Sequence, residues 1–189
     1  MKQTEITVQV FEDFEKIDLT LKNLSFNMIE YYKLTDWYFT KLSNVKDVDY
    51  LTLINNSFFI RKVDSDQVKQ FLCYKSKQTN RNGDVVREEK FKANITDIDN
   101  AIKIFKLSGL NNYCIIENGS YVYKKDDICF TIQVVKDLGI FLEYEEDESM
   151  KDLYVNEKIE LMKSRINNLN LKLGLDTSCK KVFMLVHKN

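Results

Sequence analysis

The stretch GIFLEYEED, residues 139–147, decides how this chain folds. In an extended strand, successive side chains point to opposite faces of the sheet. Phe141, Glu143 and Glu145 therefore share one face, and the leucine and tyrosine between them share the other. A strand with one apolar face and one acidic face either exposes its acidic face to water or turns that face into a polar cavity.

The beginning of the chain raises the same question. Residues 4–10, TEITVQV, place Glu5, Thr7 and Gln9 on one face of a strand and isoleucine and valine on the other. The first and the last predicted strands therefore have the same design, one apolar face and one polar face.

The bulk composition limits the function classes. The chain has 189 residues, 44% of them hydrophobic, which suits one domain covering residues 1–189. Its net charge of −1 gives no global field for nucleic acid or membrane, and no basic stripe with interleaved aromatic residues is present. No apolar run of about 20 residues and no signal-like N-terminus occur, so we expect a cytoplasmic, soluble protein without a membrane partner.

The cysteine and histidine content argues against zinc. Four cysteines are present, none of them in a CxxC pair, and the single histidine is His187. These spacings do not match a zinc site, so we expect free thiols in a reducing compartment.

Hydrophobic periodicity predicts an α+β fold with an eight-stranded antiparallel sheet, because runs of hairpin-linked strands alternate with single helices. Asn82-Gly83 is a strong hairpin signal between two of the strands. Eight such strands can close into a barrel or tunnel. The predicted strands are 4–11, 30–41, 57–63, 66–78, 85–93, 113–125, 128–135 and 139–147. The predicted helices are 11–28, 97–110 and about 152–174, the last packing on the sheet, and the apolar segment 179–186 reads as a last short strand.

Several predicted strands carry charge beside apolar residues on one face. Arg61 shares a face with Phe59, Lys75 with Phe71, and Arg87 with Glu89 and Phe91. Only four arginines occur in the chain, so an arginine on such a face is more informative than a lysine. The pattern fits either a solvated sheet face or a tunnel whose cations bind phosphate and whose carboxylates bind a divalent metal.

The arrangement resembles the CYTH, or triphosphate tunnel, superfamily, which includes class IV adenylyl cyclases, thiamine triphosphatases and inorganic triphosphatases. The most specific similarity is LGIFLEYEED, residues 138–147, to the family pattern LG-x-F-x-E-x-E. Four further strand motifs look like those of the family and follow in the same order, so the resemblance covers most of residues 4–147. These motifs are DWYF (36–39), FIRKV (59–63), CYKSK (73–77) and REEKF (87–91).

The resemblance implies a closed antiparallel tunnel that binds a small phosphorylated molecule, such as a nucleoside triphosphate or polyphosphate, with Mg²⁺ or Mn²⁺. It implies metal-assisted attack at phosphorus, by water in a triphosphatase or by the ribose 3′-hydroxyl in a cyclase. It names no catalytic acid or base. By position, the metal ligands would be Glu5, Glu143 and Glu145. The phosphate-binding residues would be Arg61, Lys75 and Arg87.

The chain departs from the family motifs at five positions, and each departure removes a charge. These positions are Thr7, Gln9, Asn118, Ser120 and Gln133. A charge-assisted hydrogen bond contributes about 1.5–3 kcal/mol, so the whole set should weaken triphosphate binding. Three functions stay open: a divergent enzyme of the family, a catalytically inactive tunnel that senses a ligand, and a protein-interaction module. A homodimer is also left open.

Overall fold

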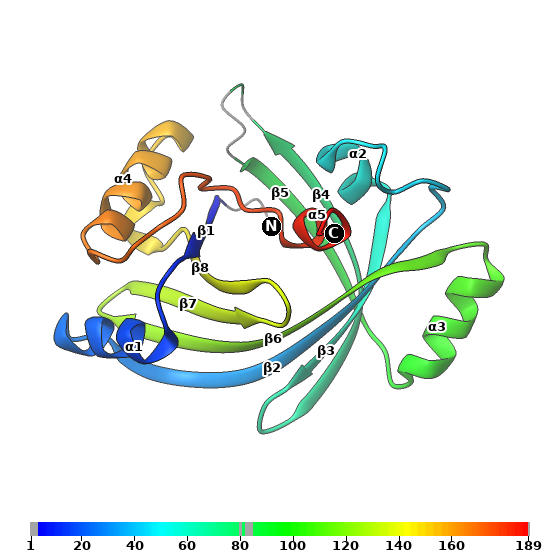
Figure 1. Cartoon of the computed structure of the whole chain (residues 1–189), viewed down its shortest axis with the longest axis horizontal. Helices are drawn as coiled ribbons and strands as arrows, with labels where there is room; N and C mark the ends of the chain where they lie inside the picture. Colours follow the sequence, from blue (N-terminus) through cyan, green and yellow to red (C-terminus); the bar gives the residue numbers. More distant parts are fainter. Residues whose placement is uncertain (1–3, 80, 82–84, 189) are drawn as a thin grey trace.

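The computed structural model describes residues 4–79, 81 and 85–188. One eight-stranded antiparallel sheet dominates the molecule (Figure 1) and confirms the α+β fold. Its strands lie in the order β1-β8-β7-β6-β2-β3-β4-β5. They are β1 (Glu5–Val10), β2 (Asn27–Thr40), β3 (Ser57–Asp64), β4 (Val68–Thr79), β5 (Val85–Asn94), β6 (Asn111–Lys125), β7 (Ile128–Val135) and β8 (Gly139–Glu145).

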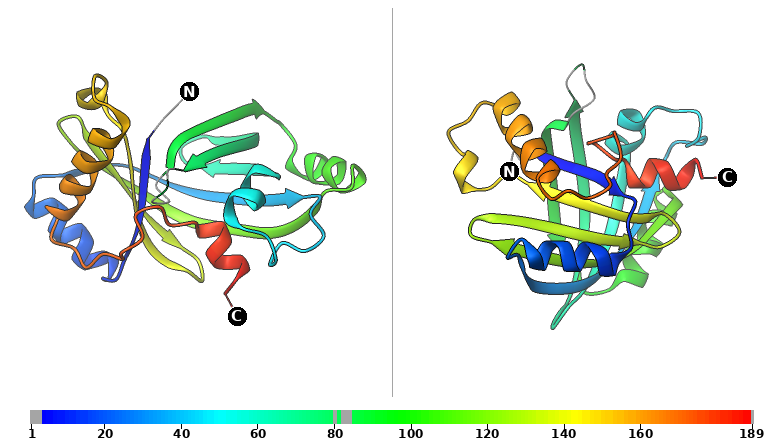
Figure 2. Two further views of the ribbon diagram at one scale, coloured as in Figure 1. Left: turned by 90° about the horizontal axis from the view of Figure 1, so that it is seen from above. Right: turned by 60° about the vertical axis from the view of Figure 1, so that its left-hand side comes forward.

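Five helices flank the sheet (Figure 2). Among the described residues, none of these helices has the length and apolar character that crossing a membrane requires. They are α1 (Phe14–Asn23), α2 (Tyr50–Asn55), α3 (Ile98–Leu107), α4 (Val155–Asn167) and α5 (Lys181–Val186), with a 3₁₀ turn at Glu148–Met150.

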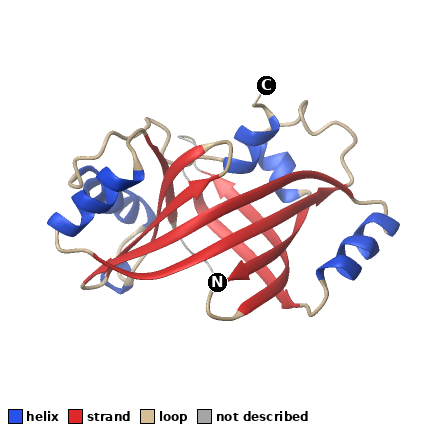
Figure 3. Cartoon of the chain, turned by 60° about the horizontal axis from the view of Figure 1, so that its bottom comes forward, coloured by secondary structure: helices blue, strands red, loops and turns tan. Residues whose placement is uncertain are grey.

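The sheet curls strongly into a half-barrel, with β1 and β5 as its edge strands (Figure 3). An ion pair links the two ends of the sheet across the hollow: Lys77 Nζ on β4, the strand beside the β5 edge, lies 3.7 Å from Glu5 Oε1 on β1. The predicted tunnel is therefore a curled sheet whose edges approach each other through side chains. The predicted hairpin turn at Asn82-Gly83 lies outside the described residues.

The convex side of β1, β6, β7 and β8 carries the largest core. The apolar face of β8, Leu142 and Tyr144, packs there against residues from α1 and α4, such as Leu21 and Met162. All four of these side chains are fully buried. Burying the apolar face of β8 in this way fixes its register, and its acidic face must then point into the concave side of the half-barrel.

The segment predicted as a last strand is instead a helix. Residues 181–186 form α5, which packs on the concave side through Val182, Met184 and Leu185 against Phe141 and Ile116. In Figure 1, α5 lies in the mouth of the half-barrel. Short apolar runs do not distinguish strand from helix, which is why the prediction was wrong.

Two further differences concern the end of one helix and the presence of another. The predicted helix 152–174 ends at Asn167, and Leu173 instead lies beside Val10 of β1 in an isolated bridge. The sequence pattern also gave no sign of α2, which is only six residues long. Its N-cap is Asp49, whose carboxylate accepts the backbone N–H of Thr52 at 3.0 Å.

Candidate functional site

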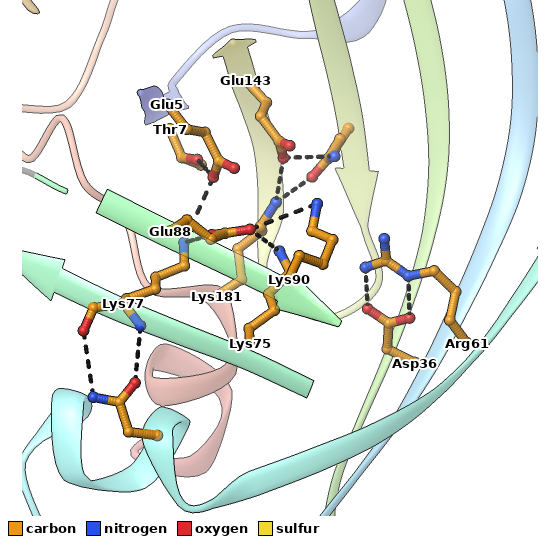
Figure 4. Close-up of polar contacts among 12 residues, drawn as sticks. Glu5, Thr7, Asp36, Arg61, Lys75, Lys77, Glu88, Lys90, Glu143 and Lys181 are labelled. Atoms are coloured by element: carbon orange, nitrogen blue, oxygen red, sulfur yellow. Dashed lines mark hydrogen bonds and ion pairs between the residues drawn. The ribbon is translucent and has the colours of Figure 1, made fainter. Parts of the chain in front are cut away.

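The concave face of the sheet encloses a polar cavity of about 180 Å³. Directly opposed residues of neighbouring strands share a face, so the cavity lining follows from the strand register. Among the described residues, six basic and four acidic side chains line it, and Figure 4 shows most of them. They are Arg61, Lys75, Lys77, Lys90, Lys180 and Lys181, with Glu5, Asp36, Glu143 and Glu145.

Five of the six predicted site residues line this cavity. The three predicted metal ligands, Glu5, Glu143 and Glu145, each offer a carboxylate oxygen, and these oxygens lie within 4.8 Å of one another. The pairing of β1 with β8 brings them together, since Glu5 lies opposite Glu145 and Thr7 opposite Glu143. The polar face of TEITVQV therefore lines a cavity, which answers the question that its pattern raised.

Arg87 is the exception, and its predicted place on the inward face is wrong. In the β4–β5 ladder, Lys77 lies opposite Glu88 and Lys75 opposite Lys90, which turns Glu88 and Lys90 toward the hollow. Arg87 points to the other face, where it pairs with its neighbour Glu89. A slip of one residue in register exchanges the two faces of a strand, and the prediction for this strand made that slip.

A buried ion network occupies the inward face of β4 and β5. The Glu88 carboxylate lies 2.8 Å from Lys77 Nζ, 3.2 Å from Lys75 Nζ and 3.5 Å from Lys90 Nζ (Figure 4). Glu88 is only 5% exposed. Burial alone would raise the pKa of Glu88, but Lys75 and Lys77 outweigh burial and lower it. The carboxylate therefore stays ionised at neutral pH.

The two lysines of β4 stay charged for the complementary reason. Burial would lower the pKa of Lys77, but the carboxylates of Glu5 and Glu88 raise it well above its ordinary value. The pKa of Lys75 is raised in the same way, chiefly by Glu88. In Glu5, burial would raise the carboxyl pKa, yet Lys77 and Lys75 lower it far below the usual range. The hollow is thus densely charged at neutral pH.

Arg61 is held by a bidentate ion pair. Its Nε and Nη2 donate to the two carboxylate oxygens of Asp36 at 2.7 and 2.6 Å. The two residues lie opposite each other on β2 and β3, and Asp36 is 2% exposed. Burial would lower the pKa of Arg61, but Asp36 raises it above its ordinary value. The pair fixes the guanidinium in one orientation beside the cavity.

Lys181 reaches the acidic cluster from α5. Its Nζ lies 3.1 Å from Glu143 Oε2 and also donates to Gln133 Oε1. Gln133 Nε2 in turn donates to the same Glu143 oxygen at 2.8 Å. One carboxylate of the cluster is therefore already engaged by a cation and an amide of the chain.

The positions that depart from the family motifs lie on the same concave face. Thr7 Oγ1 donates to Glu5 Oε1 at 3.2 Å, and Ser120 Oγ donates to Asn118 Oδ1 at 2.8 Å. Gln9 Nε2 donates to the backbone carbonyl of residue 138 at 3.4 Å. The neutral side chains at these positions thus make local polar contacts, and Thr7, Asn118 and Gln133 line the cavity.

Sequence reasoning missed six charged residues of the hollow. Lys77 follows Lys75 by two residues, so strand alternation could have found it. Asp36 lies in the motif DWYF, but no role was assigned to it. Glu88 and Lys90 were missed because the wrong face of β5 was taken as the inward one. Nothing in the sequence pattern connects residues 180 and 181 with the strands that line the cavity, although Lys181 contacts Glu143, 38 residues earlier in the chain. The missed residues are Asp36, Lys77, Glu88, Lys90, Lys180 and Lys181.

The acidic cluster fits a hard divalent cation. Mg²⁺ and Mn²⁺ prefer oxygen ligands and are usually held by a few carboxylates, with water and substrate phosphate in the remaining positions. Glu5, Glu143 and Glu145 supply three carboxylates in reach of one another. The lowered pKa of Glu5 keeps its carboxylate deprotonated, as a metal ligand must be.

Comparison with known proteins agrees with this geometry. No family model matches the chain. The chain is 29% identical over 188 residues to a protein of Methanocaldococcus jannaschii named "Putative adenylate cyclase", and the match covers 97% of each. The PH1819 protein of Pyrococcus horikoshii superposes with a TM-score of 0.75 at 15% identity, over 99% of each chain.

A third similar protein is from Hippeastrum. The structure of the "Putative adenylyl cyclase HpAC1" of Hippeastrum, described as revealing a dominant triphosphatase activity, superposes with a TM-score of 0.62 at 13% identity. It covers 99% of this chain and 100% of the other. The resemblance to the CYTH superfamily is confirmed: the fold is CYTH-like, and two of these three similar proteins are named for cyclase or triphosphatase chemistry.

Proposed function

We propose that the cavity binds a triphosphate-bearing small molecule, a nucleoside triphosphate or an inorganic polyphosphate, together with Mg²⁺ or Mn²⁺. One observation carries the proposal: six basic side chains and three clustered carboxylates converge on one enclosed hollow. A multiply charged anion loses much hydration on entering such a site, and only several fixed cations together with a metal offset that cost.

The acidic and the basic residues of the cavity would have different roles. Glu5, Glu143 and Glu145 would hold the metal, and Lys75 and Arg61 would hold phosphate oxygens. The Asp36 pair occupies Nε and Nη2 of Arg61, so Nη1 is the nitrogen that would turn to the ligand. The bound metal would supply Lewis-acid polarisation of a phosphoryl oxygen. The names of the similar proteins favour attack at phosphorus, of the triphosphatase or adenylyl cyclase type.

A second function, a non-catalytic ligand sensor, is favoured by a different observation. The charges of the hollow are already paired with one another, as Glu88 with its lysines and Lys181 with Glu143 show. A ligand must break such pairs to bind, and five positions of the family motifs carry no charge here. Binding without turnover is the outcome that this alternative predicts.

Calorimetric titration with ATP and with tripolyphosphate, each with and without Mn²⁺, tests the proposal. We expect metal-dependent binding that the double substitution Glu143→Gln/Glu145→Gln abolishes. Lys75→Met should weaken anion binding by about 10- to 150-fold, the equivalent of one charge-assisted contact. Arg87→Gln is the matched control, because this basic residue lies on the opposite face, and it should leave binding unchanged.

Each outcome has a definite reading. An absence of binding by the wild-type protein at millimolar ligand would overturn the proposal. Equal losses in the Lys75 and Arg87 variants would overturn the assignment of the cavity. Where binding is found, assays for phosphate release and for cyclic nucleotide separate an enzyme from a sensor.

A further inference from the structure

The structure brings one cation to the acidic cluster from outside the strands that carry the family motifs. Lys181 belongs to α5, and its ammonium group contacts Glu143, a residue of the three-carboxylate cluster. Its side chain is 18% exposed and that of Glu143 is 20% exposed. The contact is therefore mostly shielded from water, in contrast to an ordinary surface ion pair.

Backbone and apolar contacts hold Lys181 in place. The segment before α5 pairs with β1: the N–H of Thr7 donates to Thr177 at 3.1 Å, and the N–H of Cys179 donates to Thr7 at 2.8 Å. Val182, the next residue after Lys181, is 4% exposed and packs with Phe141. The side chain therefore enters the hollow from a fixed anchor point.

The position of this lysine matters for charge. On β1, the family motif would place a lysine where this chain has Gln9, and no cation enters the hollow from that position. Lys181, the first residue of α5, and Lys180 directly before it both line the cavity instead. Positive charge missing from a strand is thus present on a helix that is distant in sequence.

Glu143 cannot serve Lys181 and a divalent cation equally well. The Lys181 ammonium lies 3.1 Å from Glu143 Oε2, so a metal ion bound to that carboxylate would repel it. In the free protein, the partners of this ammonium group are Glu143 and Gln133. An anionic ligand in the same cavity would offer the displaced ammonium a new partner.

We propose that Lys181 is a ligand-binding residue that neutralises Glu143 in the free protein and turns to the phosphate oxygens of the ligand when a divalent cation occupies Glu143. This inference rests on the proposed function. It predicts that one substitution has opposite effects on metal and on anion. Loss of a purely structural contact would not produce that pattern.

Titration of Mn²⁺ alone, followed by calorimetry and by the electron paramagnetic resonance signal of free Mn²⁺, is the first arm. Lys181→Met should bind Mn²⁺ about two- to fivefold more tightly than wild type, since a competing ion pair is gone. Lys188→Met is the matched control, because Lys188 follows α5 and bonds the carbonyl of Asp137. It should bind Mn²⁺ as wild type does.

Titration of tripolyphosphate in the presence of saturating Mn²⁺ is the second arm. Lys181→Met should bind it at least about tenfold more weakly, Lys181→Arg should retain most of the affinity, and Lys188→Met should match wild type. Equal affinities of Lys181→Met and wild type in either arm, or weaker binding by Lys181→Met in both, would overturn the inference. Failure of wild type to bind tripolyphosphate with Mn²⁺ would overturn the proposed function itself, so the two failures are distinguishable.

Discussion

Replacing Glu88 by glutamine should destabilise the fold and yet strengthen anion binding. Glu88 is the shared partner of Lys75, Lys77 and Lys90 on the inward face of β4 and β5. The substitution keeps the shape of the side chain and removes its charge. Three lysine ammonium groups then lie close together without the carboxylate that neutralises them.

The magnitude follows from the burial of the network. The side chains of Glu88, Lys77 and Lys75 are 6%, 10% and 13% exposed, and the two closest pairs lie at 2.8 and 3.2 Å. Breaking a buried ion pair by removing one partner costs about 3–5 kcal/mol. For a chain of this size, that corresponds to a fall in Tm of about 6–20 °C. The unpaired lysines raise the positive potential of the hollow, so tripolyphosphate should bind more tightly than to wild type.

Urea unfolding followed by tryptophan fluorescence measures the first effect. Trp37, the single tryptophan of the chain, packs in the apolar cluster beneath α3 and should report unfolding. Glu89→Gln is the matched control: it removes the same charge one residue along, from a pair with Arg87 in which both side chains are 38% exposed. That control should stay within about 0.5 kcal/mol of wild type. Equal free energies of unfolding for the two variants would refute the reasoning.

Two further predictions concern stability. The folded-state pKa values of Glu5 and Glu88 lie below their ordinary value of 4.5. The stability that the two carboxylates contribute is therefore complete above about pH 4.5. It is lost as the pH falls through the folded-state pKa values. Thermal unfolding from neutral pH into the acid range should show this loss, and a smaller loss in Glu88→Gln. In the core, Leu142→Ala should lower the free energy of unfolding by about 2–5 kcal/mol, because Leu142 is fully buried. Leu107→Ala is the control, since Leu107 is 89% exposed, and it should change that free energy by less than about 0.5 kcal/mol. Urea titrations measure both.

Strand alternation predicted most of the fold, and the family resemblance predicted the three residues of the acidic cluster. Where one face of a strand is apolar, as in β1 and β8, burial of that face settles which residues point into the hollow. The resemblance to the family placed Glu5, Glu143 and Glu145 together, and the structure brings their carboxylates within 4.8 Å. The resemblance also assigned Arg61 and Lys75 to the inward face, where the cavity contains both.

The prediction failed at β5 because this strand has no apolar face that burial could identify. Residues 87–90, Arg-Glu-Glu-Lys, carry a charge at every position, so neither face is marked as apolar. The ladder also shifts register between Gln78 and Thr79, beside the start of β5. The outward face of this strand even carries Phe91, which is 60% exposed. The match of REEKF to the family motif therefore decided the prediction, and it selected the outward face.

The charge of the hollow depends on the whole concave surface rather than on the family motifs alone. Counting motif positions predicts a cavity that has lost three cations, because Gln9, Asn118 and Ser120 are neutral. The structure adds lysines at positions that the motifs do not assign, from β4, β5 and α5: Lys77, Lys90, Lys180 and Lys181. Long side chains from separate elements can reach one hollow, so a cation lost from one strand can be replaced from another element without leaving a trace in the local sequence. This redistribution makes the loss of motif residues weak evidence against anion binding, and it moves the decisive test to the residues that line the cavity.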